Sequence, residues 1–309
     1  MILVATWRDG VFAFGPNGVA HELAGESVAH LTLDAGGAPL AIVGEGALYR
    51  REPNGEWTRW VDAGPPLSCC VATGETVFAG TSDAKMVRID RQGRVDALAG
   101  FEAVPGRARW YAGSMIVDGR RVGPPLGVRS IAATCDGAVL LANVHVGGIP
   151  RSLDGGLTWQ PTLDIDCDAH QVCAHPSDPA RVAAATAAGL AISRDAGRTW
   201  QIETEGLHAR HCTAVAFVGD DLVVSAAADP FAAEAGVYRR RADREGLQPV
   251  LPHWTDRLVD THAIAARGAT AAMADGGGHL YVSRDHGRTW IGAHAGLPAP
   301  SGVVIASSD

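Results

Sequence analysis

The sequence has few charged or aromatic residues and no stretch suited to crossing a membrane. Charged residues make up 19% and aromatic residues 6% of the 309-residue chain. No apolar run reaches the length of about 18 residues that a membrane-spanning helix requires. The net charge is −8, and the basic residues form no extended stripe. We therefore expect neither nucleic acid nor a membrane as a partner.

Metal- and nucleotide-binding signatures of the common kinds are also missing. The six cysteines include no pair with CxxC spacing, and there is no Gly-rich phosphate-binding loop, so we expect no nucleotide cofactor. The first residues, MILVATWRDGVFAF, show no basic segment followed by a small-residue cleavage site. This pattern predicts a protein without a secretory signal, located in the cytoplasm, whose cysteines stay reduced and buried.

Glycine, proline and short apolar segments are abundant instead. The chain contains 38 Gly, 17 Pro and 47% hydrophobic residues. Short runs of Ala and β-branched residues alternate with turn residues, which is typical of antiparallel hairpins. One segment recurs three times at the same point of this pattern, as SLDGGLTW at 152–159, SRDAGRTW at 193–200 and SRDHGRTW at 283–290. An internal repeat of about 40 residues predicts an all-β repeat architecture.

The repeat length predicts a β-propeller of seven four-stranded antiparallel blades, with six or eight blades as the alternatives. Six units lie near 27–62, 67–99, 128–163, 168–206, 210–252 and 260–297. Residues 1–25 supply three further strands and residues 300–309 supply one, so pairing of the terminal strands would close the ring. We expect one domain over 1–309, with residues 101–127 as an insert that forms a hairpin over the channel, either as a lid or as an insertion without a function of its own.

The three motifs resemble the Asp-box, or BNR repeat, which occurs in sialidases, sortilin-type receptors and many bacterial propellers. The resemblance implies that the motif stabilises the hairpin between the third and fourth strands of a blade, on the outer rim. Asp and Ser bind turn N–H groups there, and Trp covers the turn. The residues given this structural role are Asp154, Trp159, Asp195, Trp200, Asp285 and Trp290.

The resemblance does not extend to the catalytic residues of sialidases. Those enzymes use three arginines, the first in an Arg-Ile-Pro stretch, together with a Tyr–Glu pair and an acidic residue. This chain has no Arg-Ile-Pro and only four tyrosines. Three of them, Tyr49, Tyr238 and Tyr281, share one repeat position before the motif, which indicates packing. We do not expect sialidase activity.

Histidines mark the first positions of the innermost strands. Side chains at these positions converge on the axis of a propeller, and clustered imidazoles favour a transition metal such as Fe, Cu, Zn or Ni. The alternative is structural, with each imidazole bound to a carbonyl of the neighbouring blade. The candidate metal ligands are His30, His170, His211 and His262.

Other polar and aromatic residues are expected near the same channel mouth. They would orient the metal ligands or contact the substrate. Asp168 could orient an imidazole or bind the metal directly, although a solvated acidic loop is the simpler interpretation of its segment. The full set is Trp7, Arg129, Asn143, His145, Asp168 and Phe231.

Three functions fit this sequence. The leading hypothesis is an enzyme or binding protein for a small-molecule ligand at the channel mouth, with a single metal ion that supports an oxygenase, hydrolase or lyase reaction. The second is a non-catalytic scaffold that binds a protein partner. The third is a carbohydrate-active hydrolase, which requires paired carboxylates.

Overall fold

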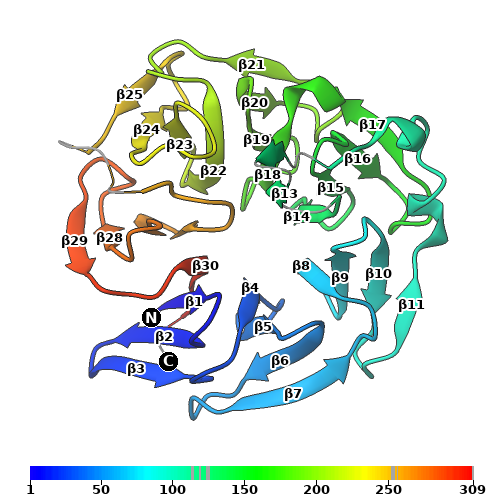
Figure 1. Ribbon diagram of the computed structural model, residues 1–309, viewed down its shortest axis with the longest axis horizontal. Helices are drawn as coiled ribbons and strands as arrows, with labels where there is room; N and C mark the ends of the chain where they lie inside the picture. The colour runs from blue at the N-terminus through cyan, green and yellow to red at the C-terminus, as the bar shows by residue number, and fades with distance from the viewer. Residues whose placement is uncertain (113–114, 118–119, 123–125, 252–254, 256, 308–309) are drawn as a thin grey trace.

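The chain forms a ring of seven four-stranded antiparallel sheets around a central axis (Figure 1). The structure, a computed structural model, describes the chain except for residues 113–114, 118–119, 123–125, 252–254, 256 and 308–309. The prediction of a seven-bladed propeller is confirmed. No helix among the described residues is long and apolar enough to cross a membrane.

Six blades are built from consecutive strands, innermost strand first. The first three are β4(Val28–Leu33), β5(Pro39–Val43), β6(Ala47–Arg51) and β7(Trp57–Asp62); β8(Leu67–Thr73), β9(Thr76–Thr81), β10(Met86–Ile89) and β11(Val95–Ala97); and β14(Val128–Ala133), β15(Leu140–Val144), β16(Ile149–Ser152) and β17(Gln160–Leu163). The next three are β18(Ala169–Ala174), β19(Val182–Thr186), β20(Gly189–Ser193) and β21(Gln201–Glu203); β22(His211–Val218), β23(Asp221–Ala227), β24(Gly236–Arg240) and β25(Leu247–Pro249); and β26(Ile264–Arg267), β27(Thr270–Ala274), β28(Leu280–Ser283) and β29(Ile291–His294).

The seventh blade combines both ends of the chain. It consists of β30(Pro300–Ile305), β1(Ile2–Thr6), β2(Val11–Gly15) and β3(Gly18–Glu22). β30 is the innermost strand and pairs antiparallel with β1, beside which it lies in Figure 1. The terminal strands therefore protect each other's edges, and the predicted closure is confirmed.

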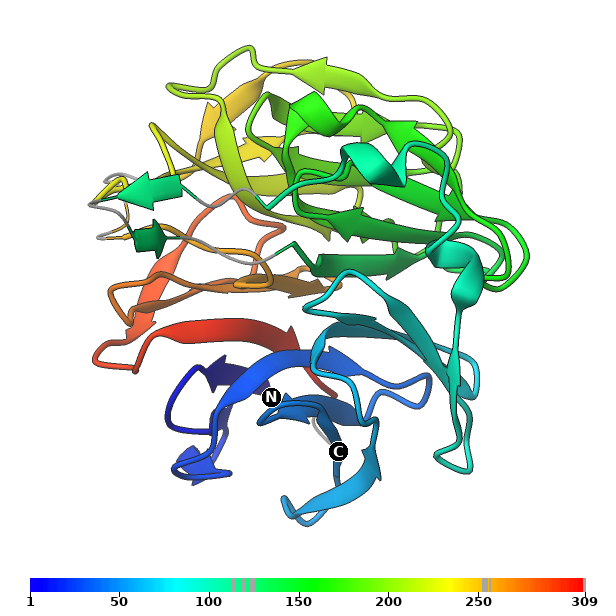
Figure 2. The same ribbon diagram turned by 45° about the vertical axis from the view of Figure 1, so that its right-hand side comes forward.

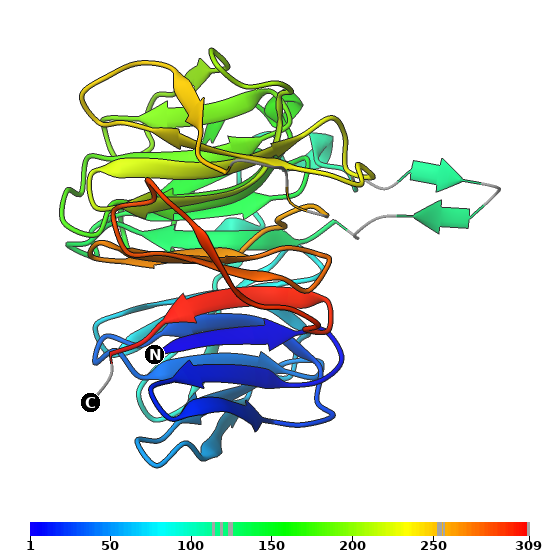
Figure 3. The ribbon, with the colours of Figure 1, turned by 90° about the vertical axis from the view of Figure 1, so that its left-hand side faces the viewer.

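The insert between the second and third blades begins inside the core and then leaves the ring. It contains η1(Ala99–Phe101), η2(Arg107–Arg109), β12(Met115–Val117) and β13(Arg120–Val122). Phe101 is fully buried, and its ring lies 5.1 Å from that of Trp159 and 5.6 Å from that of Trp110. β12 and β13 pair as a hairpin that stands away from one face of the ring (Figures 2 and 3). The parts of the expected lid at 113–114, 118–119 and 123–125 lie outside the described residues.

Each interface between neighbouring blades has its own apolar core. Seven clusters of buried residues occupy the seven interfaces of the ring. Small side chains allow the sheets to approach closely, as with the fully buried Ala183, Ala184 and Ala185 of β19. Burial of apolar surface between blades provides most of the stability of such a ring.

Several inner strands carry a β-bulge near their first residues. Strand pairing skips Ala29 in β4, Ser68 in β8, Arg129 in β14 and His170 in β18. A bulge bends the strand and redirects a side chain, and bulges are frequent next to active sites. These positions lie at the same end of their strands, so the bulges present Ser68, Arg129 and His170 at one mouth of the channel.

A ring of hydrogen bonds joins the same ends of the inner strands. At least one bond connects each blade with the next, and it usually runs from a side chain to a backbone group. The donor and acceptor residues are Ser301 and Val28, His30 and Cys70, Ser68 and Val128, Val172 and Ser130, His170 and Cys212, Thr213 and Val259, and Val303 and His262. The mouth is therefore held by polar contacts, while apolar contacts hold the blades.

The repeated Asp motif lies on the hairpin between the third and fourth strands of three blades. In the copy at 193–200, Asp195 Oδ1 accepts hydrogen bonds from Ser193 Oγ (2.9 Å) and the Thr199 N–H (2.8 Å). Asp195 Oδ2 accepts one from Thr199 Oγ1 (2.7 Å), and Ser193 Oγ accepts one from the Gly197 N–H (2.8 Å). The copies at Asp154 and Asp285 make the same four bonds.

The motif tryptophans cover these turns in two ways. Trp159 and Trp290 donate their indole N–H to the motif Gly156 and Gly287 carbonyls. Trp200 donates instead to Thr162 Oγ1 of the preceding blade, at 3.1 Å. The motif at 193–200 therefore also connects two blades.

We predict that Asp195→Ala destabilises the fold without changing ligand or metal binding. Loss of the carboxylate leaves turn donors unpaired and should lower the free energy of unfolding by about 1–2 kcal/mol at pH 7 in urea titrations. Hydrogen bonds from the turn hold the pKa of Asp195 well below its usual range, against the opposing effect of burial. The stabilisation is therefore present above pH of about 4 and is lost at lower pH.

The matched control is Glu245→Ala, at an exposed carboxylate, which should change stability by less than about 0.5 kcal/mol. A D195A protein as stable as the control, or a difference from wild type that grows as the pH falls below 4, would contradict the assigned role.

Candidate functional site

One group of potential metal ligands stands out at the channel mouth. His145, Asp168 and His170 each offer one donor atom, and these atoms lie within 4.8 Å of one another. It is the one group of three or more such residues at this spacing that the described part of the chain contains. His145 follows β15, whereas Asp168 and His170 lie at the start of β18. The group therefore connects two neighbouring blades.

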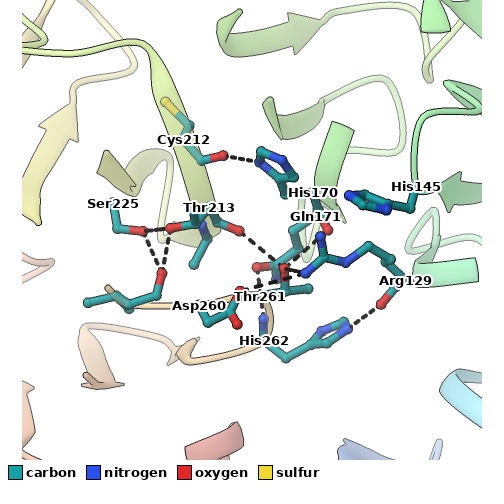
Figure 4. Close-up of polar contacts among 12 residues, drawn as sticks. Arg129, His145, His170, Gln171, Cys212, Thr213, Ser225, Asp260, Thr261 and His262 are labelled. Carbon is teal, nitrogen blue, oxygen red and sulfur yellow. Dashed lines mark hydrogen bonds and ion pairs between the residues drawn. The ribbon is translucent and has the colours of Figure 1, made fainter. Parts of the chain in front are cut away.

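The orientation of His170 is fixed by the bulge and by a backbone bond. Its Nδ1 lies 2.6 Å from the Cys212 carbonyl oxygen (Figure 4). Because a carbonyl only accepts, Nδ1 carries the proton and Nε2 holds a lone pair. That Nε2 lies 3.6 Å from Asp168 Oδ2. A backbone acceptor on one ring nitrogen is the arrangement that commonly orients a metal-binding imidazole.

Asp168 is placed by an unusual backbone conformation. It ends η3(Ile165–Cys167) with a left-handed φ of 46°, which is uncommon for a residue other than glycine. Its Oδ1 is buried and has no hydrogen-bond partner among the described residues, and it lies 3.8 Å from His145 Nε2. Burial acts to raise the pKa of Asp168, but the nearby His170 and the positive charge of Arg129 outweigh it and hold the pKa below its usual value. A buried carboxylate oxygen without a partner calls for a cation or a donor.

Arg129 brings a positive charge to the same space. Its backbone carbonyl accepts a hydrogen bond from His262 Nε2 at 2.8 Å. Its guanidinium crosses the channel, where Nη2 lies 3.4 Å from Thr261 Oγ1 and 3.7 Å from Asp260 Oδ1 (Figure 4). After burial, the Arg129 charge is the next cause that lowers the pKa of His145, to about 4. Arg129 therefore faces the candidate ligands.

The turn before β26 closes this side of the channel. Gln171 Oε1 accepts hydrogen bonds from the His262 N–H (3.1 Å) and the Val215 N–H (3.3 Å), and the Val259 carbonyl accepts from Thr213 Oγ1 (2.6 Å) and Ser225 Oγ (2.9 Å). Sequence analysis did not identify Gln171, Asp260 or Thr261, because the pairing of distant polar residues leaves no local pattern.

The four histidines predicted as ligands do not share one position in their blades. His170 is a bulge residue, His30 follows a bulge, His211 begins β22, and His262 lies in a turn with a left-handed φ of 65°. The His30 and His262 rings contact each other at 4.3 Å, and the His170 and His211 rings at 4.5 Å. His30 Nε2 lies 3.0 Å from the Cys70 carbonyl. The structure thus joins only His170 to the group that contains His145 and Asp168.

The remaining predicted residues lie at the same end of the channel. Asn143 is fully buried next to this end of β15, and neither of its amide atoms has a hydrogen-bond partner among the described residues. Trp7 and Phe231 lie in loops after β1 and β23, on the face where the inner strands begin. Both are exposed, at 48% and 59%, and so is Tyr111, at 55%, whose N–H bonds the Val146 carbonyl. The three aromatics therefore rim the mouth.

The sequence matches no family model and no curated protein. Solved propellers share its fold. A GH74 enzyme of Niastella koreensis has a TM-score of 0.63 and 13% identity, with 86% of this chain and 45% of that chain covered. A GH74 xyloglucanase of Xanthomonas campestris has a TM-score of 0.59 and 16% identity, with 87% and 45% covered. The WD40 repeats of RRP9 have a TM-score of 0.62 and 10% identity, with 91% and 84% covered.

These similarities establish a β-propeller and not an activity. The chain spans less than half of each GH74 chain, and all three identities are far too low to carry over function. The argument for function therefore depends on the residues at the mouth.

We predict that His30 makes the fold sensitive to acid. Burial, and next to it the charge of His262, hold the pKa of His30 well below 6.5, although the Cys70 carbonyl acts to raise it. The pKa of His262 is lowered to about 4, by burial first and also by the Arg129 charge, although the Arg129 carbonyl and the Asp260 charge act to raise it. An imidazole that stays neutral in the fold gains a proton on unfolding below pH 6.5, so stability falls as the pH falls.

For the test, free energies of unfolding in urea are compared at pH 7.5 and 5.0. His30→Leu should be less stable at pH 7.5, since the Cys70 carbonyl loses its donor, but its loss between the two pH values should be smaller by up to about 2 kcal/mol. His286→Asn, at an exposed histidine, is the control. An unchanged pH dependence in H30L would show that His30 does not titrate on unfolding.

Proposed function

We propose that this propeller binds a small-molecule ligand at its channel mouth through a single transition-metal ion held by His145, Asp168 and His170. The observation that carries the proposal is the convergence of two buried imidazoles and one partly buried carboxylate from neighbouring blades. Two histidines and one carboxylate are a recurrent ligand set for zinc and for non-haem iron, with positions left open for a ligand.

The spacing of the donors supports this assignment. Asp168 Oδ2 and Oδ1 lie 3.6 Å from His170 Nε2 and 3.8 Å from His145 Nε2. Direct hydrogen bonds would be shorter by more than half an ångström. Two ligands at about 2.1 Å from a tetrahedral ion lie about 3.4 Å apart. Both distances to Asp168 are thus within a few tenths of an ångström of this spacing, and all three donor atoms lie within 4.8 Å of one another.

The surroundings give each residue a distinct task. His145 and His170 are buried, whereas the side chain of Asp168 is 31% exposed. The open positions therefore face the channel on the side of Asp168. The Cys212 carbonyl keeps the lone pair of His170 directed at the group. A metal ion at such a centre polarises a bound carbonyl or lowers the pKa of a bound water.

A carbohydrate ligand is the second candidate, favoured by one observation. All three aromatic side chains that are large and exposed among the described residues, Trp7, Tyr111 and Phe231, lie on the mouth face. Aromatic faces around a polar centre suit the stacking of sugar rings, and GH74 propellers have the same fold. A hydrolase of this kind also needs two facing carboxylates. The carboxylates available at the mouth are Asp229 and Asp260, which are exposed, and Asp168, which is partly buried. We further propose that this chain belongs to the Asp-box propellers, because the turns at Asp154, Asp195 and Asp285 share the same hydrogen bonds.

We predict about one equivalent of metal per chain. Purified protein is stripped with a chelator, loaded separately with Zn²⁺, Fe²⁺, Ni²⁺ or Cu²⁺, desalted and assayed by elemental analysis. His145→Ala and Asp168→Asn should each weaken metal binding by more than about 100-fold, since each removes a ligand. Asp168→Asn keeps the shape of the side chain, so its loss of metal would not reflect unfolding.

His30→Ala is the matched control, because His30 also binds a neighbouring carbonyl but lies outside the group. The H30A protein should bind as much metal as wild type, although its melting temperature should be lower. Metal lost in H30A and retained in H145A would instead support the set His30, His170, His211 and His262. No metal with any of the four ions would overturn the proposal.

A further inference from the structure

The charge at the channel mouth indicates what kind of ligand fits there. We infer that the ligand carries a carboxylate group, which Arg129 binds beside the proposed metal. The inference rests on the proposed function and adds a substrate class to it. Arg129 carries it through four observations: its fixed backbone, its unused donors, its position beside the candidate ligands and the balance of charge.

The backbone of Arg129 is held rigidly. Pairing between β14 and β15 joins Val128 with Val144 and Ser130 with Asn143, so that Arg129 is the extra residue of the bulge. Its carbonyl is fixed from across the channel by His262. A bulge at this point directs a side chain that regular pairing would place in the sheet. The guanidinium therefore enters the channel from a preorganised base.

The guanidinium is poorly neutralised. Its contacts among the described residues both use Nη2, at 3.4 Å from Thr261 Oγ1 and 3.7 Å from Asp260 Oδ1. These separations are at or beyond the upper limit of a good hydrogen bond. The side chain of Asp260 is 60% exposed, so its charge is well screened by water. Nε and Nη1 have no partner among the described residues, while the side chain is 23% exposed.

Arg129 lies next to the candidate ligands. His145 directly follows Val144, the partner of Val128, and its N–H bonds the Gly127 carbonyl at 3.1 Å. Figure 4 shows the Arg129 side chain between His145 and His262, on its way to the turn at Asp260 and Thr261. One ligand at the mouth could therefore contact Arg129 and the group of His145, Asp168 and His170 together.

The balance of charge selects an anion with two oxygens. A divalent ion, the Asp168 carboxylate, the Arg129 guanidinium and the exposed Asp260 carboxylate sum to one positive charge when both imidazoles are neutral. A carboxylate offers one oxygen to a metal and accepts hydrogen bonds from the planar fork of a guanidinium. A neutral sugar hydroxyl offers neither charge nor this geometry. The exposed ring of Phe231, in the loop beside His211, could cover an apolar part of the same molecule.

The test measures binding of acetate and benzoate against their neutral counterparts acetamide and benzamide, by ligand-observed NMR on metal-loaded protein. Wild type should bind the carboxylates at least tenfold more tightly than the amides. Arg129→Met keeps the length of the side chain without its charge and should weaken carboxylate binding by about 30-fold. Arg129→Lys keeps the charge but not the fork, and a loss of about tenfold is expected. Arg210→Met, at an exposed arginine next to His211, should bind as wild type does.

Metal content is measured on the same samples, which separates the two proposals. Full metal content with no preference for carboxylates, or with equal affinity in R129M and wild type, would overturn this inference and leave the metal site standing. Preference for inorganic phosphate over both carboxylates would also overturn it. If the chain takes up no metal, the same titration of the metal-free protein decides whether Arg129 selects carboxylates by itself.

Discussion

The polar ring at the start of the inner strands is the constraint on which the mouth of this propeller depends. Seven sheets can pack through apolar faces alone, but such contacts do not fix how far each blade is rotated toward the axis. The bonds from Ser68 to Val128, from His170 to Cys212 and from Ser301 to Val28 set that position one blade at a time. Backbone groups that would otherwise be buried without partners are satisfied by the same bonds.

The ring also explains how one kind of residue can stabilise the fold and serve a site. His30 and His170 both bind the carbonyl of the next blade, but through different nitrogens, Nε2 in His30 and Nδ1 in His170. The second nitrogen of His30 is buried without a hydrogen-bond partner among the described residues. The second nitrogen of His170 faces Asp168. His170 is the bulge residue of its strand, whereas His30 follows the bulge. This difference in position decides whether the second ring nitrogen is enclosed in the fold or faces the candidate site.

The fold could be predicted from the sequence because the internal repeats correspond to the blades. The Ser-x-Asp-x-Gly motif recurs once per blade in three blades, and its spacing gives the blade length and the blade count. The leftover strands at the ends then require closure. The candidate site could be predicted only in outline. His145, Asp168 and Arg129 were identified as neighbours of the mouth, but their grouping depends on bulges, and a bulge shifts every later side chain to the other face without changing the composition of the strand.

The contribution of the turn before β26 lay beyond any local pattern. Val259, Thr261 and His262 contact β14, β18 and β22, and no periodicity in the sequence relates these segments.

Polar groups meet across the axis of this propeller at the level of the mouth. Arg129 crosses from β14 to the turn before β26, and His262 returns the contact to the Arg129 carbonyl. Apolar side chains could have filled the same space at a lower cost of desolvation. The buried Asn143 amide and the Asp168 oxygen without hydrogen-bond partners increase that cost further. Polar atoms left without partners where apolar packing was available need a bound group, whether water, ion or ligand, to complete their hydrogen bonds.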